Sequence, residues 1–380
     1  MTLLAQALET KRVVLCVGSG GVGKTTTAAA LAVEAARRGR RTAVLTVDPA
    51  QRLKDALGLG ALGSQARRVP LATVGARGAH LDAFLLDVKR TFDDLVRALA
   101  STPEQAERVL QNRLYQNLSG TLAGTAEYMA VETVYRLAEE GDYDLLVVDT
   151  PPARHAVDFL DAPRRLLALL DSRAFAILKD PTTILPAAGS RLAHLVLAAV
   201  LRALERFTGM GLVREIGEFV GAIEALTGAL RDRVRRVAAL LHAESTWLLL
   251  VAAPEPRLVA ETDTLVRALA AIDLRIGGIV VNRALPRALF GTATPPPAPP
   301  TGVSPTLAAR LRRSYQDLRT LAAHQEAALV PLVATGGAPV VAEVPLFPGD
   351  PASLADLATI GSHLFPGGAG HVVPARGLGR

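Results

Sequence analysis

The stretch GSGGVGKTT at residues 18–26 follows the apolar run VVLCV at residues 13–17 and opens an alanine-rich segment with helical character. It satisfies the pattern G-x-x-x-x-G-K-[ST] in the strand, loop and helix context that the pattern requires. Glycines let successive backbone N–H groups converge on an anion, and the positive end of the following helix adds to the attraction. The stretch therefore predicts a phosphate-binding loop in an α/β protein.

Each part of this loop has a predicted task. Lys24 is expected to reach the β- and γ-phosphates of a nucleotide, and the Thr25 hydroxyl is expected to bind Mg²⁺. The full set of predicted phosphate contacts is Gly20, Gly21, Val22, Gly23, Lys24, Thr25 and Thr26. A flexible glycine turn would need neither the lysine nor the threonine, so nucleotide binding is the favoured interpretation.

Two aspartates follow apolar runs that predict strands. Asp48 follows residues 42–47, and Asp149 follows residues 144–148 in DLLVVDTPPARH. A lone aspartate after a strand is more often a helix cap or a turn residue. Ligands of such sheets, however, bind outside the carboxyl ends of the strands, where two aspartates of one sheet converge. We expect Asp48 and Lys24 to be the catalytic residues, with Asp48 orienting the attacking water. We expect Asp149 to hold Mg²⁺ through a water molecule.

Six apolar runs have the character of strands buried on both faces, and helical stretches alternate with them. The runs are residues 13–17, 42–47, 144–148, 247–252, 276–281 and 339–344, and the clearest helical stretches are 26–38, 126–140 and 261–271. This alternation predicts a mostly parallel sheet with helices on both faces. The predicted fold class is an α/β P-loop NTPase.

Two regions interrupt the alternation. Residues 84–122 are expected to be helical throughout, and residues 162–244 have helical periodicity without a strand. We expect both to be insertions that form a helical subdomain on a single domain of residues 1–380. Residues 293–305, ATPPPAPPTGVSP, predict an exposed proline-rich loop, and the glycine-rich residues 366–380 predict a flexible tail.

Composition excludes several classes of protein. Of the 380 residues, 50% are hydrophobic and 21% are charged, so a sizeable core is expected and a disordered or fibrous chain is excluded. The net charge of +6 comes from scattered basic doublets without interleaved aromatics, so no nucleic-acid partner is expected. Apolar runs fall short of the ~18 residues of a membrane span, and the first residues lack a signal-peptide pattern. The expected location is the cytoplasm.

The motifs resemble the ArsA family of ATPases, which comprises arsenite-pump ATPases and relatives that deliver tail-anchored membrane proteins. The motifs that occur in the family's order are the glycine-rich loop, DPA at 48–50, DTPPARH at 149–155, APEPRLVAET at 253–262 and VVN at 280–282. The resemblance covers most of the chain. It is nearest to an actinobacterial branch with segments similar to RTFDDLV at 90–96 and YQNLSGTLAGTAEYMA at 115–130.

The resemblance implies the ligand and further residue roles. The nucleotide would be ATP with Mg²⁺, Asp48 would activate water in switch I, and Asp149 would lie near the metal in switch II. Asn282 matches an asparagine that contacts adenine, and Pro254 and Glu255 match a loop close to the base. From the residues alone, an asparagine that ends a strand is as readily a turn residue.

One position departs from the family pattern. Members usually carry a signature lysine in G-K-G-G-V-G-K-T that reaches the nucleotide of the other subunit, and Ser19 stands at this position. Serine cannot supply positive charge to the transferred phosphoryl group, and such charge is the main catalytic device of these sites. Three interpretations stay open: slow hydrolysis, another group that substitutes, or pairing with a paralogue that retains the lysine. The expected assembly is a homodimer or a heterodimer with a related ArsA-like ATPase.

Cys16 is the only cysteine. An intrachain disulfide is therefore excluded, as is a zinc or metalloid site whose thiolate ligands all come from one chain. Members of the family that bind zinc or a metalloid use thiolates, so neither site is predicted here.

The favoured function is an ATPase in which Mg-dependent binding and hydrolysis of ATP switch a dimer. Residues 162–244 stand where targeting relatives form a groove, so a hydrophobic client or a membrane protein is a candidate partner, although these apolar stripes would equally pack on one another. The alternatives are a catalytically weak nucleotide-binding subunit of a heterodimer and a MinD- or ParA-like partitioning ATPase. The partitioning ATPase is disfavoured because neither a basic amphipathic carboxyl-terminal helix nor a clustered basic surface is evident.

Overall fold

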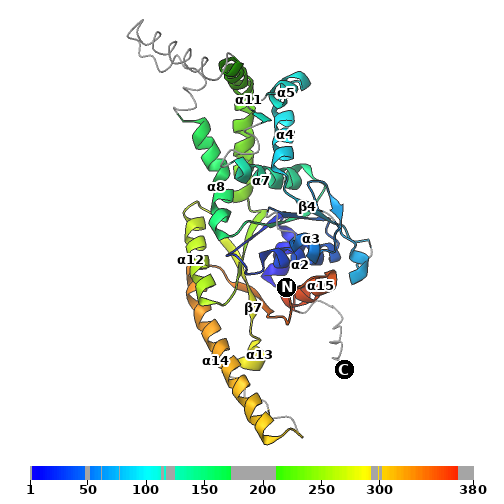
Figure 1. Cartoon of the computed structure of the whole chain (residues 1–380), viewed down its shortest axis with the longest axis vertical. Coiled ribbons are helices and arrows are strands. Elements are labelled where there is room, and N and C mark those ends of the chain that lie inside the picture. The colour runs from blue at the N-terminus through cyan, green and yellow to red at the C-terminus, as the bar shows by residue number, and fades with distance from the viewer. Residues whose placement is uncertain are drawn as a thin grey trace, which may run out of the picture. The chain divides into compact units, whose positions relative to one another are not determined.

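The computed structural model describes residues 2–47, 52–60, 62–76, 78–112, 115–116, 125–172, 211–291, 298 and 302–366. The chain forms two compact units. The first comprises Met1–Leu85, Gly141–Val157 and Glu244–Arg380, and the second comprises Leu86–Glu140 and Asp158–Ala243 (Figure 1). Residues 293–297 and 299–301 of the predicted proline-rich loop and residues 367–380 of the predicted flexible tail lie outside the described residues.

An eight-stranded sheet organises the first unit, in the order β3-β4-β2-β5-β1-β6-β7-β8. Its strands are β1 (Val13–Val17), β2 (Thr42–Thr46), β3 (Arg67–Arg68), β4 (Leu81–Leu85), β5 (Leu145–Asp149), β6 (Thr246–Ala252), β7 (Ile276–Ala284) and β8 (Val340–Pro345). All neighbours are parallel except β3 and β4, which pair antiparallel. This sheet and its helices confirm the predicted α/β P-loop NTPase class.

Helices of the first unit precede, connect or follow these strands along the chain. They are α1 (Leu3–Thr10), α2 (Lys24–Arg37), α3 (Arg52–Ala56), η1 (Leu71–Val74), α12 (Pro256–Ala270), α13 (Arg287–Phe290), α14 (Pro305–Gly336) and α15 (Leu354–Leu364). Ala28, Ala29 and Ala32 of α2 are fully buried, and their small side chains let the helix lie close to the sheet. The central strand β1 is buried at every position, which explains its unbroken apolar run.

Strand β4 contradicts the prediction of helix throughout residues 84–122. Phe84 and Leu85 belong to this strand, which pairs in parallel with β2. Asp82 interrupts its apolar pattern although it is only 5% exposed. Burial alone would raise the pKa of Asp82, but hydrogen bonds from Arg68, His80 and Tyr143 lower it below its ordinary value. Because Asp82 occupies a buried position of β4, residues 81–85 do not form the unbroken apolar run from which a strand is predicted.

The second unit is helical. Its elements are α4 (Val88–Leu99), α5 (Pro103–Leu110), α7 (Thr125–Tyr135), the π-helix η2 (Arg136–Glu140), most of α8 (Ala153–Leu170) and α11 (Gly211–His242). Arg233 of α11 contacts Glu132 at 2.7 Å and Glu140 at 2.6 Å. The pair with Glu132 is almost fully buried, so loss of either partner would leave an uncompensated charge inside the unit.

The bounds of this unit differ from the predicted insertions at 84–122 and 162–244, because it also includes residues 125–140 and starts its second segment at Asp158. Residues 173–210, which carry part of the predicted client groove, lie outside the described residues. No described helix is both long and apolar enough to cross a membrane.

Candidate nucleotide-binding site

The predicted phosphate-binding loop joins β1 to α2, and a residue of β7 fixes its shape. Gly23 is the N-cap of α2 and has a φ of 91°, in the left-handed region. A Cβ at this position would lie 2.2 Å from Nδ2 of Asn282. The same Nδ2 donates a hydrogen bond to the Val22 carbonyl oxygen at 2.8 Å. Position 23 therefore requires glycine for two reasons, its conformation and its close neighbour.

The outer part of the loop is open. A Cβ at Gly20 or at Gly21 would meet no other part of the protein within 4 Å. Helix α2 begins without a side-chain cap, and Thr26 is half-buried in its first turn. The N-terminus of an uncapped helix and an open glycine loop together attract an anion. This part of the chain can thus accept phosphate without rearranging a side chain that blocks it.

Lys24 lies against the loop. It is 7% exposed, and its Nζ donates a hydrogen bond to the Ser19 carbonyl oxygen at 2.8 Å. This contact holds the ammonium group against the loop that is predicted to bind phosphate.

Oxygen-bearing side chains meet at the end of β5. Asp149 Oδ2 accepts hydrogen bonds from Thr25 Oγ1 at 2.7 Å and from Thr46 Oγ1 at 3.1 Å. Thr46 ends β2 and is the register partner of Asp149. Carboxylate and hydroxyl oxygens suit Mg²⁺, so this donor set fits the predicted metal. Thr46 was not among the predicted site residues, although it lies one residue before the end of the strand predicted at residues 42–47.

Ser19 faces its own chain. It is fully buried, its Oγ lies 2.9 Å from Thr262 Oγ1, and it donates to the Leu258 carbonyl oxygen at 3.3 Å. Both partners belong to α12. The residue that stands in place of the signature lysine therefore ties the loop to α12 of its own chain.

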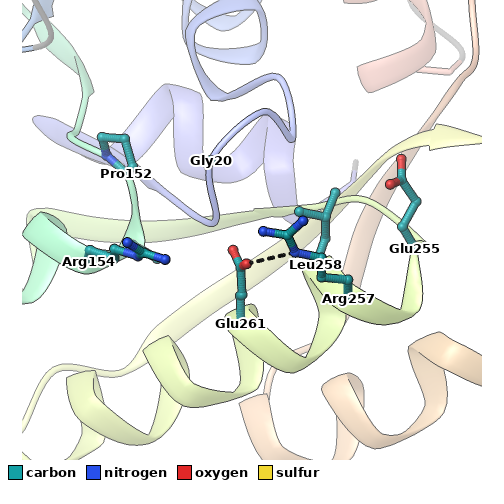
Figure 2. A pocket seen from close by; sticks show the side chains of 8 residues that line it. Gly20, Pro152, Arg154, Glu255, Arg257, Leu258 and Glu261 are labelled. Atoms are coloured by element: carbon teal, nitrogen blue, oxygen red, sulfur yellow. Dashed lines mark ion pairs between the residues drawn. The ribbon is translucent and has the colours of Figure 1, made fainter.

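A pocket of about 360 Å³ opens beside the loop. It is lined by Gly20, Pro152, Ala153, Arg154, Glu255, Arg257, Leu258 and Glu261. Figure 2 shows the side chains of Arg154 and Glu261 projecting into the space below Gly20, and an ion pair between Arg257 and Glu261 at 3.4 Å. The pocket thus presents charges of both signs next to the open part of the loop.

Comparison with known proteins identifies the family of this chain. A sequence model of the anion-transporting ATPases matches residues 11–290, which include the loop, β5 and β7. The chain belongs to this family. It is similar to ATPase get3 of Aspergillus terreus, 32% identical over 159 residues that make up 41% of this chain and 44% of the relative. It is also similar to ATPase GET3 of Phaeosphaeria nodorum, 25% identical over 284 residues, 73% of this chain and 78% of the relative.

Coverage differs between these relatives. A further similar protein is ATPase get3 of Aspergillus niger, 32% identical over 159 residues that make up 44% of the relative. The chain thus spans less than half the length of both Aspergillus proteins. It spans more than three quarters of the Phaeosphaeria nodorum protein. Membership of the anion-transporting ATPase family therefore rests on the family match over residues 11–290.

The three residues expected near adenine lie at different places in this member of the anion-transporting ATPase family. Glu255 is the N-cap of α12 and lines the pocket beside Gly20. Pro254 lines a second, much smaller cavity together with Val281 and Ala284 of β7. Asn282, between these two β7 residues, reaches the loop through Val22. Neighbours in the sequence thus face different cavities, and their contact with adenine stays a prediction.

Two further expectations concern Asp48 and Cys16. Asp48 lies outside the described residues, so its role stays a prediction. Cys16 is fully buried in β1, and burial together with the charge of Asp149 raises the pKa of its thiol despite the opposing effect of Lys24. The thiol is therefore held in its protonated form. Among the described residues, no three His, Cys, Asp or Glu side chains form a group that could hold a metal ion.

The structure adds residues that motif matching did not single out. Arg154 and Glu261 line the pocket, and Thr262 holds Ser19. Arg154 lies inside the quoted motif DTPPARH, so its distance of five residues from Asp149 was a usable signal. Glu261 and Thr262 end the quoted motif APEPRLVAET, but nothing in that motif predicts the contact between Thr262 and Ser19.

Proposed function

We propose that this member of the anion-transporting ATPase family binds ATP with Mg²⁺ and hydrolyses it to switch a dimer between two arrangements. The observation that carries the proposal is the hydrogen bond of 2.7 Å between Thr25 and Asp149, beside a loop over which Lys24 is held. A glycine loop, a lysine, and paired hydroxyl and carboxylate oxygens are the parts that phosphoryl transfer to water requires.

Each residue has a distinct task in this proposal. Backbone N–H groups from Gly20 to Thr26 bind the phosphates, and Lys24 exchanges its contact with the Ser19 carbonyl oxygen for a phosphate oxygen. Thr25 Oγ1 would bind Mg²⁺ directly and Asp149 would bind it through water, and the ion supplies positive charge to the phosphates. Asp48 orients the attacking water. Asn282 keeps the loop in its binding shape through the Val22 carbonyl oxygen.

A single-turnover experiment with the full chain tests this function. The wild-type protein should bind ATP and release phosphate, whereas Asp48→Asn should bind ATP with similar affinity and release little phosphate, because only the base for water is lost. Normal hydrolysis by Asp48→Asn would show that another group orients the water. Intact ATP in the wild-type reaction would contradict the enzymatic function itself.

Arg154 is our candidate for the group that compensates for Ser19. Its side chain is exposed and lines the pocket at Gly20, directly beside the open part of the loop. The other arginine of the pocket, Arg257, pairs with Glu261, whereas Arg154 forms no ion pair with any described residue. A guanidinium group there would stabilise the charge that develops on the terminal phosphate.

Arg154→Ala tests this role, with Arg257→Ala as the matched control from the same pocket. We expect Arg154→Ala to lower the single-turnover rate about 100-fold, in the range seen for loss of one charge-stabilising donor, with little change in ATP affinity. Arg154→Lys should recover part of the rate because it restores the charge. Equal rates for the wild type and Arg154→Ala would exclude Arg154 from the reaction.

A second candidate function is a catalytically weak subunit that binds ATP and sets the geometry of a heterodimer. The buried side chain of Ser19 favours it, since this position supplies no cation to a second subunit. The two functions differ in one measurement. Adding a lysine-bearing relative should raise the ATPase rate above the sum of the separate rates if a heterodimer forms the competent site, and purely additive rates would count against it.

The partner of the switch is proposed to be a hydrophobic client or a membrane protein, on the strength of the ArsA resemblance and of membership in a family described as anion-transporting. The helical second unit is the part of the chain in which such a partner would bind. A purified ATP-bound dimer that retains a hydrophobic tail peptide during gel filtration would support client binding. A dimer that does not retain it would exclude this class of client.

A further inference from the structure

Helix α14 carries one apolar stripe that its two halves expose differently. In the C-terminal half, which lies beside α12 in Figure 1, Ala322, Leu329 and Leu332 are at most 8% exposed. In the N-terminal half, which extends past the sheet, the leucines of the stripe are 37–48% exposed, and they are Leu307, Leu311, Leu318 and Leu321. A free helical segment of this length is marginal in water, and clustered exposed leucines mark an interaction surface.

The spacing of these leucines fits another helix. They follow one another at intervals of four, seven and three residues, which places them at the d, a, a and d positions of a heptad repeat, with Ser314 at the intervening d position. A seam restricted to a and d is typical of a coiled-coil contact. A helix that lies on a protein core or a membrane surface has a broader apolar face.

The charges beside this seam match those of a second copy. Arg310 and Asp317 occupy g positions, and neither forms an ion pair with another described residue of its own chain. In an antiparallel pair, g positions face each other, so packing Leu318 on Leu307 of the second copy places Arg310 opposite Asp317 of that copy. The two-fold symmetry of the pair then produces the same contact a second time.

A parallel pair lacks this match, because each g position would face an e position, namely Tyr315 or Ala322. Tyr315 is already held by α13 of its own chain. Its hydroxyl donates to the Leu289 carbonyl oxygen at 2.9 Å, and its ring lies 5.7 Å from that of Phe290. Helix α13 therefore covers the e side of α14 and leaves the seam and the g side exposed.

We propose that residues 305–321 of α14 pair antiparallel with the same residues of a second copy of this chain. The segment is about 25 Å long at 1.5 Å per residue, so the contact is reversible and depends on concentration. It includes no residue of the candidate nucleotide site. The pairing is therefore independent of ATP and goes beyond the nucleotide-switched dimer proposed above.

Charge reversal in the full-length protein tests the pairing. Without nucleotide, sedimentation over a concentration series should show that the wild type self-associates. Arg310→Asp and Asp317→Arg should each weaken association about 10-fold or more, since each change turns two attractive pairs into repulsive ones. An equimolar mixture of the two variants should associate as the wild type does, because the introduced charges are complementary in the mixed pair.

Further variants keep the test decisive. Leu311→Asp with Leu318→Asp should abolish association, whereas Leu346→Asp, at a position 57% exposed outside α14, should leave it unchanged. Unchanged ATP binding by all variants would show that they are folded. The proposal would be overturned by a monomeric wild type, by single variants that associate normally, or by a mixture that stays dissociated. It would also be overturned if phosphatidylglycerol vesicles bound the wild type but not the double aspartate variant.

Discussion

The two sides of the candidate nucleotide site differ in how their side chains are held. On the loop side, Ser19, Lys24 and Asp149 are at most 7% exposed, and each takes part in hydrogen bonds within the chain. On the rim of the pocket, Arg257 and Glu261 have side chains that are 86% and 40% exposed and approach to 3.4 Å. Changes on the loop side should therefore alter stability, ATP binding or both, whereas changes on the rim should alter only the electrostatic field that a ligand experiences.

Gly23→Ala should produce the largest effect on the loop side. The left-handed φ costs an alanine about 1–3 kcal/mol, and the added methyl group would lie 2.2 Å from Asn282 Nδ2. We expect a loss of stability greater than the strain alone, together with loss of ATP binding. Urea unfolding and calorimetric titration measure the two effects. Gly39→Ala is the matched control, because Gly39 has a φ of 89° and a Cβ there would meet nothing within 4 Å.

In the Asn282→Ala variant, the cost of backbone strain at position 23 can be measured without the steric clash with the Asn282 amide. With the amide removed, Gly23→Ala should cost less stability than it does in the wild type, since the new methyl group meets no Nδ2. A double-mutant cycle measures this difference. Equal costs in the two backgrounds would show that β7 does not restrict the loop.

Lys24→Ala should follow in size. Loss of a hydrogen bond to a charged group is worth about 1.5–3 kcal/mol, which corresponds to about 10- to 100-fold weaker ATP binding. Titration with ATP measures the change. Lys11→Ala is the control, because Lys11 precedes β1 and its ammonium group donates to the Glu244 carbonyl oxygen, whereas the loop follows β1. If both variants bound ATP alike, the loop would not hold the phosphates.

Ser19→Ala should have a smaller effect, and on stability alone. The variant loses the contacts with Thr262 Oγ1 and the Leu258 carbonyl oxygen, but Thr262 keeps its own bond to Leu258 at 2.6 Å. We expect a loss of about 1 kcal/mol in urea unfolding and an unchanged ATPase rate. Ser362→Ala is the exposed control. A lower rate at unchanged stability would give the Ser19 hydroxyl a direct part in the reaction.

The loop side was largely predictable because its chemistry depends on local patterns. An apolar run, a glycine loop, a lysine and a threonine specify strand, loop and helix in one short segment, and the apolar run before Asp149 specifies a buried strand. The parallel register then brings Asp149 beside Thr25. Strand β4 was not predicted because Asp82 breaks its apolar run. Contacts with Arg68, His80 and Tyr143, which lie outside that run, make the burial of Asp82 tolerable.

The rim and the direction of Ser19 were not predictable, because both depend on α12, a helix more than 200 residues further along the chain. No local pattern shows that Thr262 contacts Ser19, or that Arg154 and Glu261 line one pocket. The pairing of β1 with β6 carries α12 to the loop, and the pairing of β1 with β5 carries Arg154 there. Motifs specified the residues that hold phosphate, whereas tertiary packing determined the charges that surround it.

Glu261→Gln should have the smallest effect, and it should strengthen ATP binding instead of weakening it. Its exposed pair with Arg257 contributes at most about 0.5 kcal/mol, so stability should not change measurably. Removing a negative charge from the pocket at Gly20 should strengthen ATP binding about two- to threefold at low ionic strength, and the gain should vanish in high salt because screening weakens exposed charges. Titrations at two salt concentrations measure it. If Glu261→Gln instead weakened binding as much as Lys24→Ala, the rim would share the phosphate site, and the difference between the two sides would not hold.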